Sequence, residues 1–206
     1  GGPEIPVSLA GRDAGGDDAP DRTVNAELGP QAAVAVLDPG TRAVRALVGG
    51  EEFGSRPFNR AVQSRRPMGS TVKPFLYAAA LEAGIDASET FPNQRICFRG
   101  ARGRPWCPRN YQGGYDGRDY GMGEALARST NVIAVRVMQR IGAWPVADLL
   151  ASLGIDGAPR DLSLALGSAE ASPLALANAM ATFAAGGRYD TPYLIEDVVD
   201  ARGRLL

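Results

Sequence analysis

Hydrophobic positions are sparse at the start of the chain and become regular from residue 32 onward. Residues 1 to 30 are rich in Gly, Asp and Pro and show no hydrophobic period, so we expect a linker or the edge of a preceding domain. Two apolar runs then follow, AAVAVL and AVRALV, and they flank the turn sequence DPGT at residues 38 to 41. Proline and glycine at the central turn positions favour the required backbone angles. The pattern predicts a β-hairpin.

Several later segments have the spacing of helices. The first, STVKPFLYAAALEA, begins at Ser70, has Pro74 in its first turn, and is followed by Gly84, the residue type that most often ends a helix in the left-handed conformation. Three further helices are predicted in GMGEALARS, NVIAVRVMQRIG and PVADLLASLG. The clearest helix start is Ser172-Pro173, which combines a capping serine with a proline at the first helical position, ahead of LALANAMATFAAGG.

The remaining segments predict the sheet and one long loop. Residues 85 to 121 are rich in Gly, Pro and aromatic residues without a clear period, and we expect a surface excursion. Its cysteines, Cys97 and Cys107, fit either a local disulfide or two free thiols. Near the end, PYLIEDVVD predicts a strand and ARGR a turn. We therefore expect an α+β fold, with an antiparallel sheet and the helix from Ser70 packed at its centre.

Composition excludes several kinds of function. The 206 residues are 45% hydrophobic, which is enough for a substantial core, and the net charge is -1 with scattered arginines. Nucleic acid is therefore not an expected partner. Histidine is absent, which rules out a Ser-His-Asp triad and a histidine metal site, and we expect neither metal nor cofactor. No apolar stretch is long enough to cross a bilayer, and the first residues lack the pattern of a signal peptide.

Candidate chemistry centres on Lys73, the only lysine among 22 basic residues. It follows Ser70 by three positions, so on a helix the two side chains share a face. A serine hydroxyl needs a base to become nucleophilic, and a lysine with a lowered pKa can serve where no histidine exists. Taken alone, an S-x-x-K spacing also fits a capping serine followed by a solvated lysine.

Four segments, in order, carry a resemblance to a known family. They are VAVLDPGTRAVRALVGG, FNRAVQSRRPMGSTVKPFLYAAALEAG, WCPRNYQGGYDGRDYGMGEALARSTNVIAVRV and LALGSAEASPLALANAMATFAAGG. Together they resemble the transpeptidase domain of the class A, bifunctional penicillin-binding proteins. The third segment contains the family's S-x-N motif as Ser129 and Asn131. The family's K-T-G motif is missing, because the only lysine is already used and no threonine precedes a glycine.

The resemblance implies a role for each motif residue. Ser70 is expected to be the nucleophile, Lys73 its base and Ser129 a proton relay, while Asn131 orients the substrate amide. Ser129 and Asn131 also fit a helix N-cap pair, which is the alternative for this motif. Residues 31 to 206 are expected to form the N-terminal part of the domain, of the serine transpeptidase/β-lactamase-like fold and incomplete at the C-terminus.

The implied function is that of a peptidoglycan D,D-transpeptidase that forms a serine acyl-enzyme and is inhibited by β-lactams. The expected partners are stem peptides and β-lactam antibiotics, within a membrane-anchored parent that has an upstream glycosyltransferase domain. The expected location is the periplasmic or extracellular face of the bacterial cytoplasmic membrane. A D,D-carboxypeptidase, a non-catalytic β-lactam sensor and a degenerate binding module remain alternatives.

Overall fold

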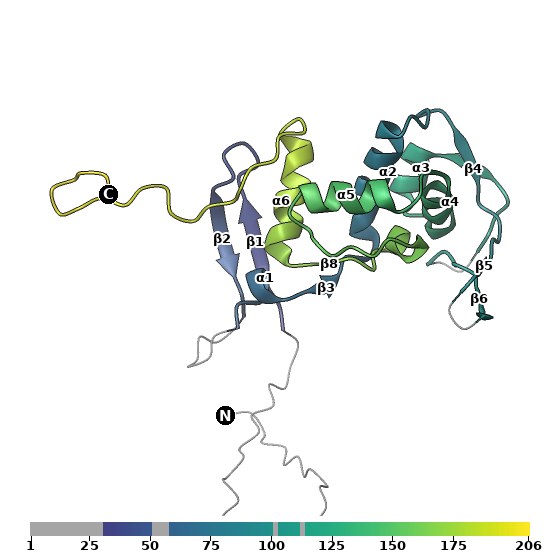
Figure 1. Cartoon of the computed structure of the whole chain (residues 1–206), viewed down its shortest axis with the longest axis horizontal. Helices are drawn as coiled ribbons and strands as arrows, with labels where there is room; N and C mark the ends of the chain where they lie inside the picture. Colours follow the sequence, from purple (N-terminus) through teal and green to yellow (C-terminus); the bar gives the residue numbers. More distant parts are fainter. Residues whose placement is uncertain (1–30, 51–57, 101–102, 112–113) are drawn as a thin grey trace, which may run out of the picture. The chain divides into compact units, whose positions relative to one another are not determined.

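The structure, a computed structural model, describes residues 31–50, 58–100, 103–111 and 114–206. Helices and short strands are interspersed along the chain, and the strands pair two by two (Figure 1). The helical elements are α1 (Arg60–Gln63), η1 (Gly69–Val72), α2 (Lys73–Glu82), α3 (Met122–Ala127), α4 (Asn131–Ile141), α5 (Trp144–Ser152), η3 (Leu162–Leu166) and α6 (Pro173–Ala184). The strands are β1 (Val34–Leu37), β2 (Val44–Val48), β3 (Arg66–Pro67), β4 (Thr90–Pro92), β5 (Phe98–Arg99), β6 (Pro105–Trp106), β7 (Asp119–Gly121) and β8 (Glu170–Ala171).

The predicted opening hairpin is present. Strands β1 and β2 pair antiparallel, and the Asp38 carboxylate closes the turn by accepting from the Gly40 N–H at 3.0 Å and the Thr41 N–H at 2.8 Å. Helix α6 lies along β1 in Figure 1. Its start matches the sequence signal, because the Ser172 hydroxyl accepts from the Ala175 N–H at 3.2 Å. A second layer thus covers the hairpin on one side.

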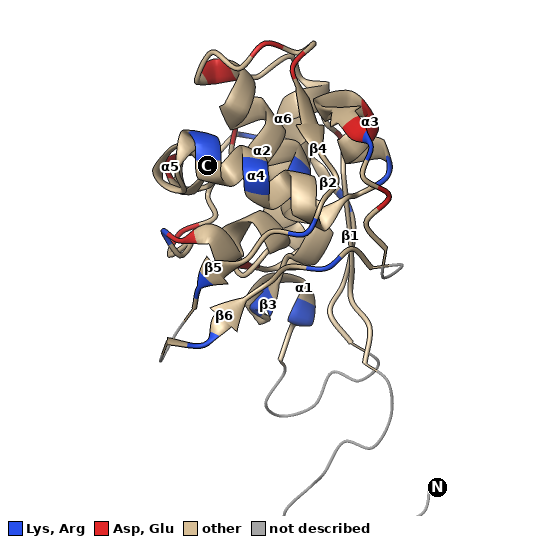
Figure 2. Ribbon diagram, turned by 90° about the vertical axis from the view of Figure 1, so that its right-hand side faces the viewer, with Lys and Arg blue, Asp and Glu red and all other residues tan. Residues whose placement is uncertain are grey.

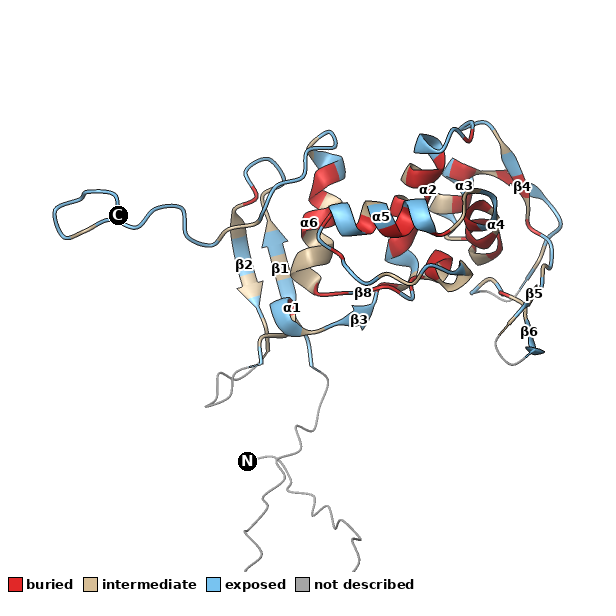
Figure 3. Cartoon of the chain, in the orientation of Figure 1, coloured by how far each residue is buried: buried red, intermediate tan, exposed pale blue. Residues whose placement is uncertain are grey.

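Helix α2 occupies the centre of the core, as the sequence predicts. It packs against α3, α4, α5 and η3, and its Phe75 and Leu76 side chains have no exposed surface. Figure 3 shows the buried residues gathered where α2, α4 and α5 meet. The first part of helix α4 is buried on all sides, since residues 132–135 are each fully covered, whereas Gln139 and Arg140 near its end are exposed. Both helices are therefore held by contacts over most of their surface.

The first helix differs from the prediction at its start. The backbone from Gly69 to Val72 forms a 3-10 turn, and the α-helix begins only at Lys73. Pro74 explains this difference, because it has no N–H with which to bond the Ser70 carbonyl four residues back. The Lys73 N–H takes that carbonyl instead, which is the three-residue spacing of a 3-10 helix. At the other end, Gly84 has the expected positive φ of 87°.

The segment from residue 85 to 121 is more ordered than the sequence predicts. Strand β4 pairs with β7 and β5 pairs with β6, so it contains two short antiparallel ladders. A disulfide joins Cys97 to Cys107, and the alternative of two free thiols is wrong in this structure. Strands of two or three residues give too little alternation to be recognised in the sequence, whereas cross-strand pairing and the disulfide stabilise this segment in the fold.

The strand predicted over residues 192–200 is not formed. The structure has only isolated bridges there, between Ala43 and Tyr193 and between Val199 and Leu205, and the apolar side chains are exposed. A strand is stable only when a neighbouring strand satisfies its backbone groups, and the described residues supply no such neighbour along this segment. The prediction for residues 1 to 30 lies outside the described residues.

Charged side chains are distributed over many elements. Figure 2 shows the basic and acidic positions scattered along the ribbon, with no element that collects the arginines. Lys73 differs from the exposed arginines because it is fully buried within the core. Among the described residues, no helix has the length and apolar character needed to cross a membrane.

Candidate active site

Ser70 lies on the 3-10 turn η1, which a distant segment anchors. The Met68 N–H donates to the Ala169 carbonyl at 2.8 Å, and the Gly69 N–H donates to the Gly167 carbonyl at 3.1 Å. Gly167 has a φ of 81°, and a side chain there would collide with the Gly69 backbone, so the close approach requires glycine. The Ser70 side chain is exposed, and within the described part of the chain its hydroxyl makes no hydrogen bond.

The Lys73 amine is buried and surrounded by acceptors. Its Nζ lies 2.7 Å from the Ser129 carbonyl oxygen, 3.0 Å from Ser129 Oγ and 2.7 Å from Asn131 Oδ1. An ammonium group has three donors, which matches these three acceptors. Burial lowers the pKa of Lys73 to about 8, because the charged form loses its hydration. A side chain with this pKa can accept a proton near neutral pH.

Ser129 and Asn131 belong to the tight turn between α3 and α4. Ser129 has a φ of 53°, a left-handed conformation that is uncommon for residues other than glycine. In this conformation both its carbonyl and its hydroxyl reach Lys73. The alternative assignment as an N-cap pair is wrong in this structure, because the N-cap position of α4 is Thr130, which makes no side-chain cap bond.

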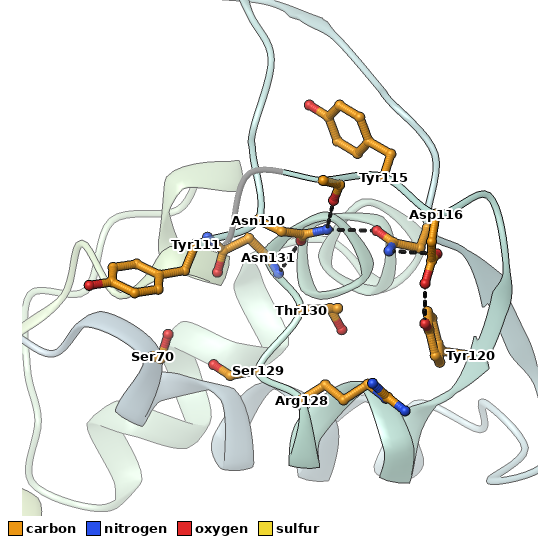
Figure 4. Close-up of a pocket in the computed structure, with 12 residues that line it drawn as sticks. Ser70, Asn110, Tyr111, Tyr115, Asp116, Tyr120, Arg128, Ser129, Thr130 and Asn131 are labelled. Atoms are coloured by element: carbon orange, nitrogen blue, oxygen red, sulfur yellow. Dashed lines mark hydrogen bonds between the residues drawn. The ribbon is translucent and has the colours of Figure 1, made fainter.

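Three of the four predicted site residues are therefore joined directly. Lys73 contacts Ser129 and Asn131, although 56 and 58 positions separate them along the chain. Ser70 is not hydrogen-bonded to Lys73, but it lines the same pocket as Ser129 and Asn131, and Figure 4 shows Ser70 and Ser129 at the same end of that pocket. Ser70 lies on η1 and Lys73 begins α2, which follows η1 directly, and the hydrogen bonds from Lys73 to Ser129 connect the start of α2 to the pocket.

The pocket is open and has a volume of about 690 Å³. One end is formed by the serines, and the other by polar and aromatic residues of the segment that precedes α3 (Figure 4). Its lining consists of Ser70, Asn93, Asn110, Tyr111, Gly114, Tyr115, Asp116, Tyr120, Arg128, Ser129, Thr130 and Asn131. Among the described residues, no group of side chains has the composition of a metal site.

Sequence reasoning did not identify Asn110, which contacts the start of α4. Its Oδ1 accepts from the Asn131 N–H at 2.9 Å and from the Val132 N–H at 3.2 Å. Its Nδ2 donates to Asn93 Oδ1 and to the Gly114 carbonyl, each at 2.8 Å. No periodic pattern surrounds Asn110 in the sequence, and the signal that could have singled it out is an asparagine within a Gly- and Pro-rich loop.

The far end of the pocket is organised around Asp116. This carboxylate accepts from Asn93 Nδ2 at 2.9 Å and from the Tyr120 hydroxyl through a short hydrogen bond. The Tyr120 hydrogen bond is the main reason that the pKa of Asp116 is lowered, and it raises the pKa of Tyr120. The guanidinium groups of Arg118 and Arg128 each lie 5.3 Å from the Tyr120 ring centre. Asp116 is therefore an ionised acceptor.

The sequence and the fold both have counterparts in known proteins. The family model described as the penicillin binding protein transpeptidase domain matches residues 32–204. The chain belongs to this family. The resemblance to the class A penicillin-binding proteins is confirmed, and so is the α+β fold of the serine transpeptidase type.

Individual relatives agree with the family assignment. Penicillin-binding protein 1A of Neisseria lactamica is 40% identical over 179 residues, which are 85% of this chain and 22% of that protein. The crystal structure of penicillin-binding protein 1A from Haemophilus influenzae is similar with a TM-score of 0.79 and 36% identity, covering 85% of this chain and 26% of the other. The imipenem acyl-enzyme complex of penicillin-binding protein A from Mycobacterium tuberculosis is similar with a TM-score of 0.74 and 25% identity, over 85% and 51% of the two chains.

The matched relatives are much longer than this chain, which spans about a fifth of the curated protein from Neisseria lactamica. The K-T-G triplet expected from the resemblance does not occur in these 206 residues. The described structure accordingly contains the sites of the first two motifs, S-x-x-K and S-x-N, and their neighbours.

Proposed function

We propose that this chain carries the nucleophile and the base of a peptidoglycan D,D-transpeptidase. The observation that supports this most directly is the contact of the buried Lys73 amine with Ser129 and Asn131, next to the pocket that Ser70 lines. A lysine with a pKa of about 8 is a suitable base for a serine where no histidine exists. An acyl-enzyme with imipenem is described for the penicillin-binding protein A of Mycobacterium tuberculosis, which supports a covalent mechanism.

Acylation is the first half of the proposed reaction. Ser70 Oγ attacks the carbonyl carbon of the penultimate D-Ala of a stem peptide, and its proton passes to the neutral Lys73 amine. The C–N bond to the terminal D-Ala then breaks, and the departing nitrogen receives a proton from Lys73 through the Ser129 hydroxyl, which lies 3.0 Å from Nζ. Asn131 orients the substrate amide, so the reacting atoms are held in position.

Deacylation reverses these proton movements. The amine of a neighbouring stem peptide attacks the Ser70 ester carbonyl and loses a proton to Lys73 through Ser129. The bond from the carbonyl to Ser70 Oγ then breaks, and Lys73 returns the proton to the serine. The products are a cross-linked peptide and the free enzyme. Water in place of the amine would give a D,D-carboxypeptidase.

The organisation of the parent protein is also part of the proposal. Residues 31 to 206 form the N-terminal part of the transpeptidase domain, and residues 1 to 30 are a linker or the edge of a preceding domain. The parent protein has an upstream glycosyltransferase domain and a membrane anchor. The active site faces the periplasm or the cell exterior, where stem peptides and β-lactams reach it. This chain spans 22% of the relative named penicillin-binding protein 1A, which supports a longer parent protein.

The test is covalent labelling of the full-length gene product with penicillin. Mass spectrometry of the digested protein should show the adduct on the Ser70 peptide. The Ser70→Ala variant should lose it, while Ser168→Ala, at an exposed serine outside the pocket lining, should keep it. Absence of an adduct at Ser70 in the folded wild-type protein would exclude the mechanism.

Product analysis separates the proposed reaction from the alternatives. A transpeptidase releases D-Ala and forms a cross-linked product when an acceptor amine is added. A carboxypeptidase releases D-Ala with or without the amine. A sensor becomes acylated and releases no D-Ala from peptide substrates, and a degenerate module is not acylated at all.

A further inference from the structure

Resting on the proposed function, a further role follows for Asn110, at the start of α4. We propose that Asn110 is a positioning residue for acylation, because it fixes the first turn of α4 and thereby holds the Asn131 carboxamide with Oδ1 toward Lys73. Among the hydrogen bonds of the described residues, none joins Asn110 to Lys73, so the effect of Asn110 on the reaction passes through Asn131.

The start of α4 depends on Asn110 because the residue at the N-cap position of the helix makes no capping hydrogen bond. The first N–H groups of a helix have no partner within the helix and need an acceptor. The N-cap residue Thr130 makes no cap bond, and its hydroxyl donates instead to the Ala125 carbonyl at 3.0 Å. Asn110 Oδ1 accepts from both Asn131 and Val132 in its place. A residue 21 positions earlier thus provides the cap of this helix.

The neighbouring backbone fixes which way the Asn131 amide points. Asn131 Nδ2 donates to the Arg109 carbonyl at 2.8 Å, so Oδ1 is the atom left to face Lys73. A rotation by 180° would place the amide NH₂ against the ammonium group and its oxygen against a carbonyl oxygen. Both contacts would be repulsive. Arg109 and Asn110 are adjacent, so one short segment sets the position of the helix start and the orientation of its first side chain.

The orientation of Asn110 is fixed in turn by a chain of amides that ends on a carboxylate. Asn110 Nδ2 donates to Asn93 Oδ1 at 2.8 Å, and Asn93 Nδ2 donates to Asp116 Oδ1 at 2.9 Å. An ionised carboxylate can only accept, which leaves the Asn93 oxygen for Asn110 and the Asn110 oxygen for the helix N–H groups. Figure 4 shows this chain of hydrogen bonds along one wall of the pocket, from Asp116 to Asn131.

The two ends of this chain of hydrogen bonds have opposite hydrogen-bonding roles. Lys73 is a donor when protonated, and Asp116 is an acceptor, so every amide between them has one favourable orientation. Without Asn110 the chain of hydrogen bonds is broken at its centre, and the Asn131 backbone N–H loses the acceptor that holds this residue in position. The consequence is a misplaced Oδ1, which costs Lys73 one of its three acceptors.

The experiment is a double-mutant cycle on the acylation rate of the full-length gene product, with a fluorescent penicillin as the probe. Asn110→Ala is expected to lower the second-order acylation rate roughly 10- to 100-fold through misplacement of the site. Asn131→Ala is expected to lower it at least as much. If Asn110 acts through Asn131, adding Asn110→Ala to Asn131→Ala changes the acylation rate less than about threefold, because the effects of substitutions at contacting residues are not additive.

The pH profile gives a readout that a purely structural role would not change. The ammonium form of Lys73 loses an acceptor in Asn110→Ala, so the midpoint of the acidic limb should move down by about one pH unit. The matched control is Asn59→Ala, which removes an asparagine cap of the same kind, on the Ala61 N–H at 3.0 Å, from a residue outside the pocket lining. That variant should keep the wild-type rate and midpoint.

A second substitution guards against a variant that fails to fold. Asn110→Asp keeps an oxygen for the two helix N–H groups, but its second oxygen faces Asn93 Oδ1 and the Gly114 carbonyl oxygen. It should therefore react faster than Asn110→Ala, or than Asn131→Ala where Asn110→Ala does not fold, and more slowly than the wild-type protein. The positioning role would be overturned if the two substitutions lowered the acylation rate independently, so that their effects multiplied in the double variant. It would also be overturned if Asn110→Ala lowered the rate and left the midpoint of the pH profile unchanged. Wild-type protein that is not acylated at Ser70 would instead remove the proposed function itself.

Discussion

Replacing Lys73 with arginine keeps the positive charge of this side chain and removes its capacity to act as a base. An arginine cannot be deprotonated in a protein, whereas burial brings the pKa of Lys73 to about 8. With that pKa, roughly 9% of the side chains are neutral at pH 7, against about 0.03% for a lysine at 10.5. The fold therefore raises the amount of free base about 300-fold.

The expected result is a fall of roughly 10²- to 10⁴-fold in the acylation rate of Lys73→Arg at pH 7, which is the usual contribution of a general base. The rate of wild-type protein should rise with pH and level off above pH 8, because only neutral Lys73 accepts the proton of Ser70. The assay is stopped-flow acylation by a fluorescent penicillin, on full-length protein whose folding is verified by circular dichroism.

Two outcomes would refute this reasoning. One is an acylation rate that does not change between pH 6 and 9 in the wild-type protein. The other is a folded Lys73→Arg variant that reacts within about threefold of the wild-type rate, well below the usual effect of removing a general base.

Three further predictions concern stability. The pKa of Lys73 is lower in the folded protein than in the unfolded chain, so burying the charged amine destabilises the fold fully below pH 8 and less as the pH rises toward 10.5. In urea titrations, the free energy of unfolding of the wild-type protein, relative to that of Lys73→Arg, should therefore increase from pH 8 to 10.5. Replacing Cys97 and Cys107 together by serine should destabilise the protein by about 2 to 3 kcal/mol in the same titrations, and equal stability with and without reductant would contradict this. Ser172→Ala should cost about 1 kcal/mol through loss of the α6 cap, whereas Ser152→Ala, at an exposed hydroxyl, should leave the denaturation midpoint unchanged.

How well the sequence predicts a structural feature depends on how far apart along the chain the interacting residues lie. The hairpin turn, the α6 cap at Ser172 and the helix end at Gly84 were predicted, because each involves neighbours within a few positions. The break at Pro74 is also local, and it could have been predicted from the missing N–H. The strand expected over residues 192–200 failed, because a strand needs a partner that the segment itself does not contain.

The candidate site shows the same division. The sequence by itself determined the motif residues, and the family to which they belong, since the residue types and their order along the chain are sufficient for that. Only the tertiary structure decided that Lys73 is buried, that Ser129 adopts a left-handed backbone, and that Asn110 caps a helix 21 positions away. Burial and hydrogen bonding across such separations depend on how the helices pack, and that packing lowers the pKa of Lys73.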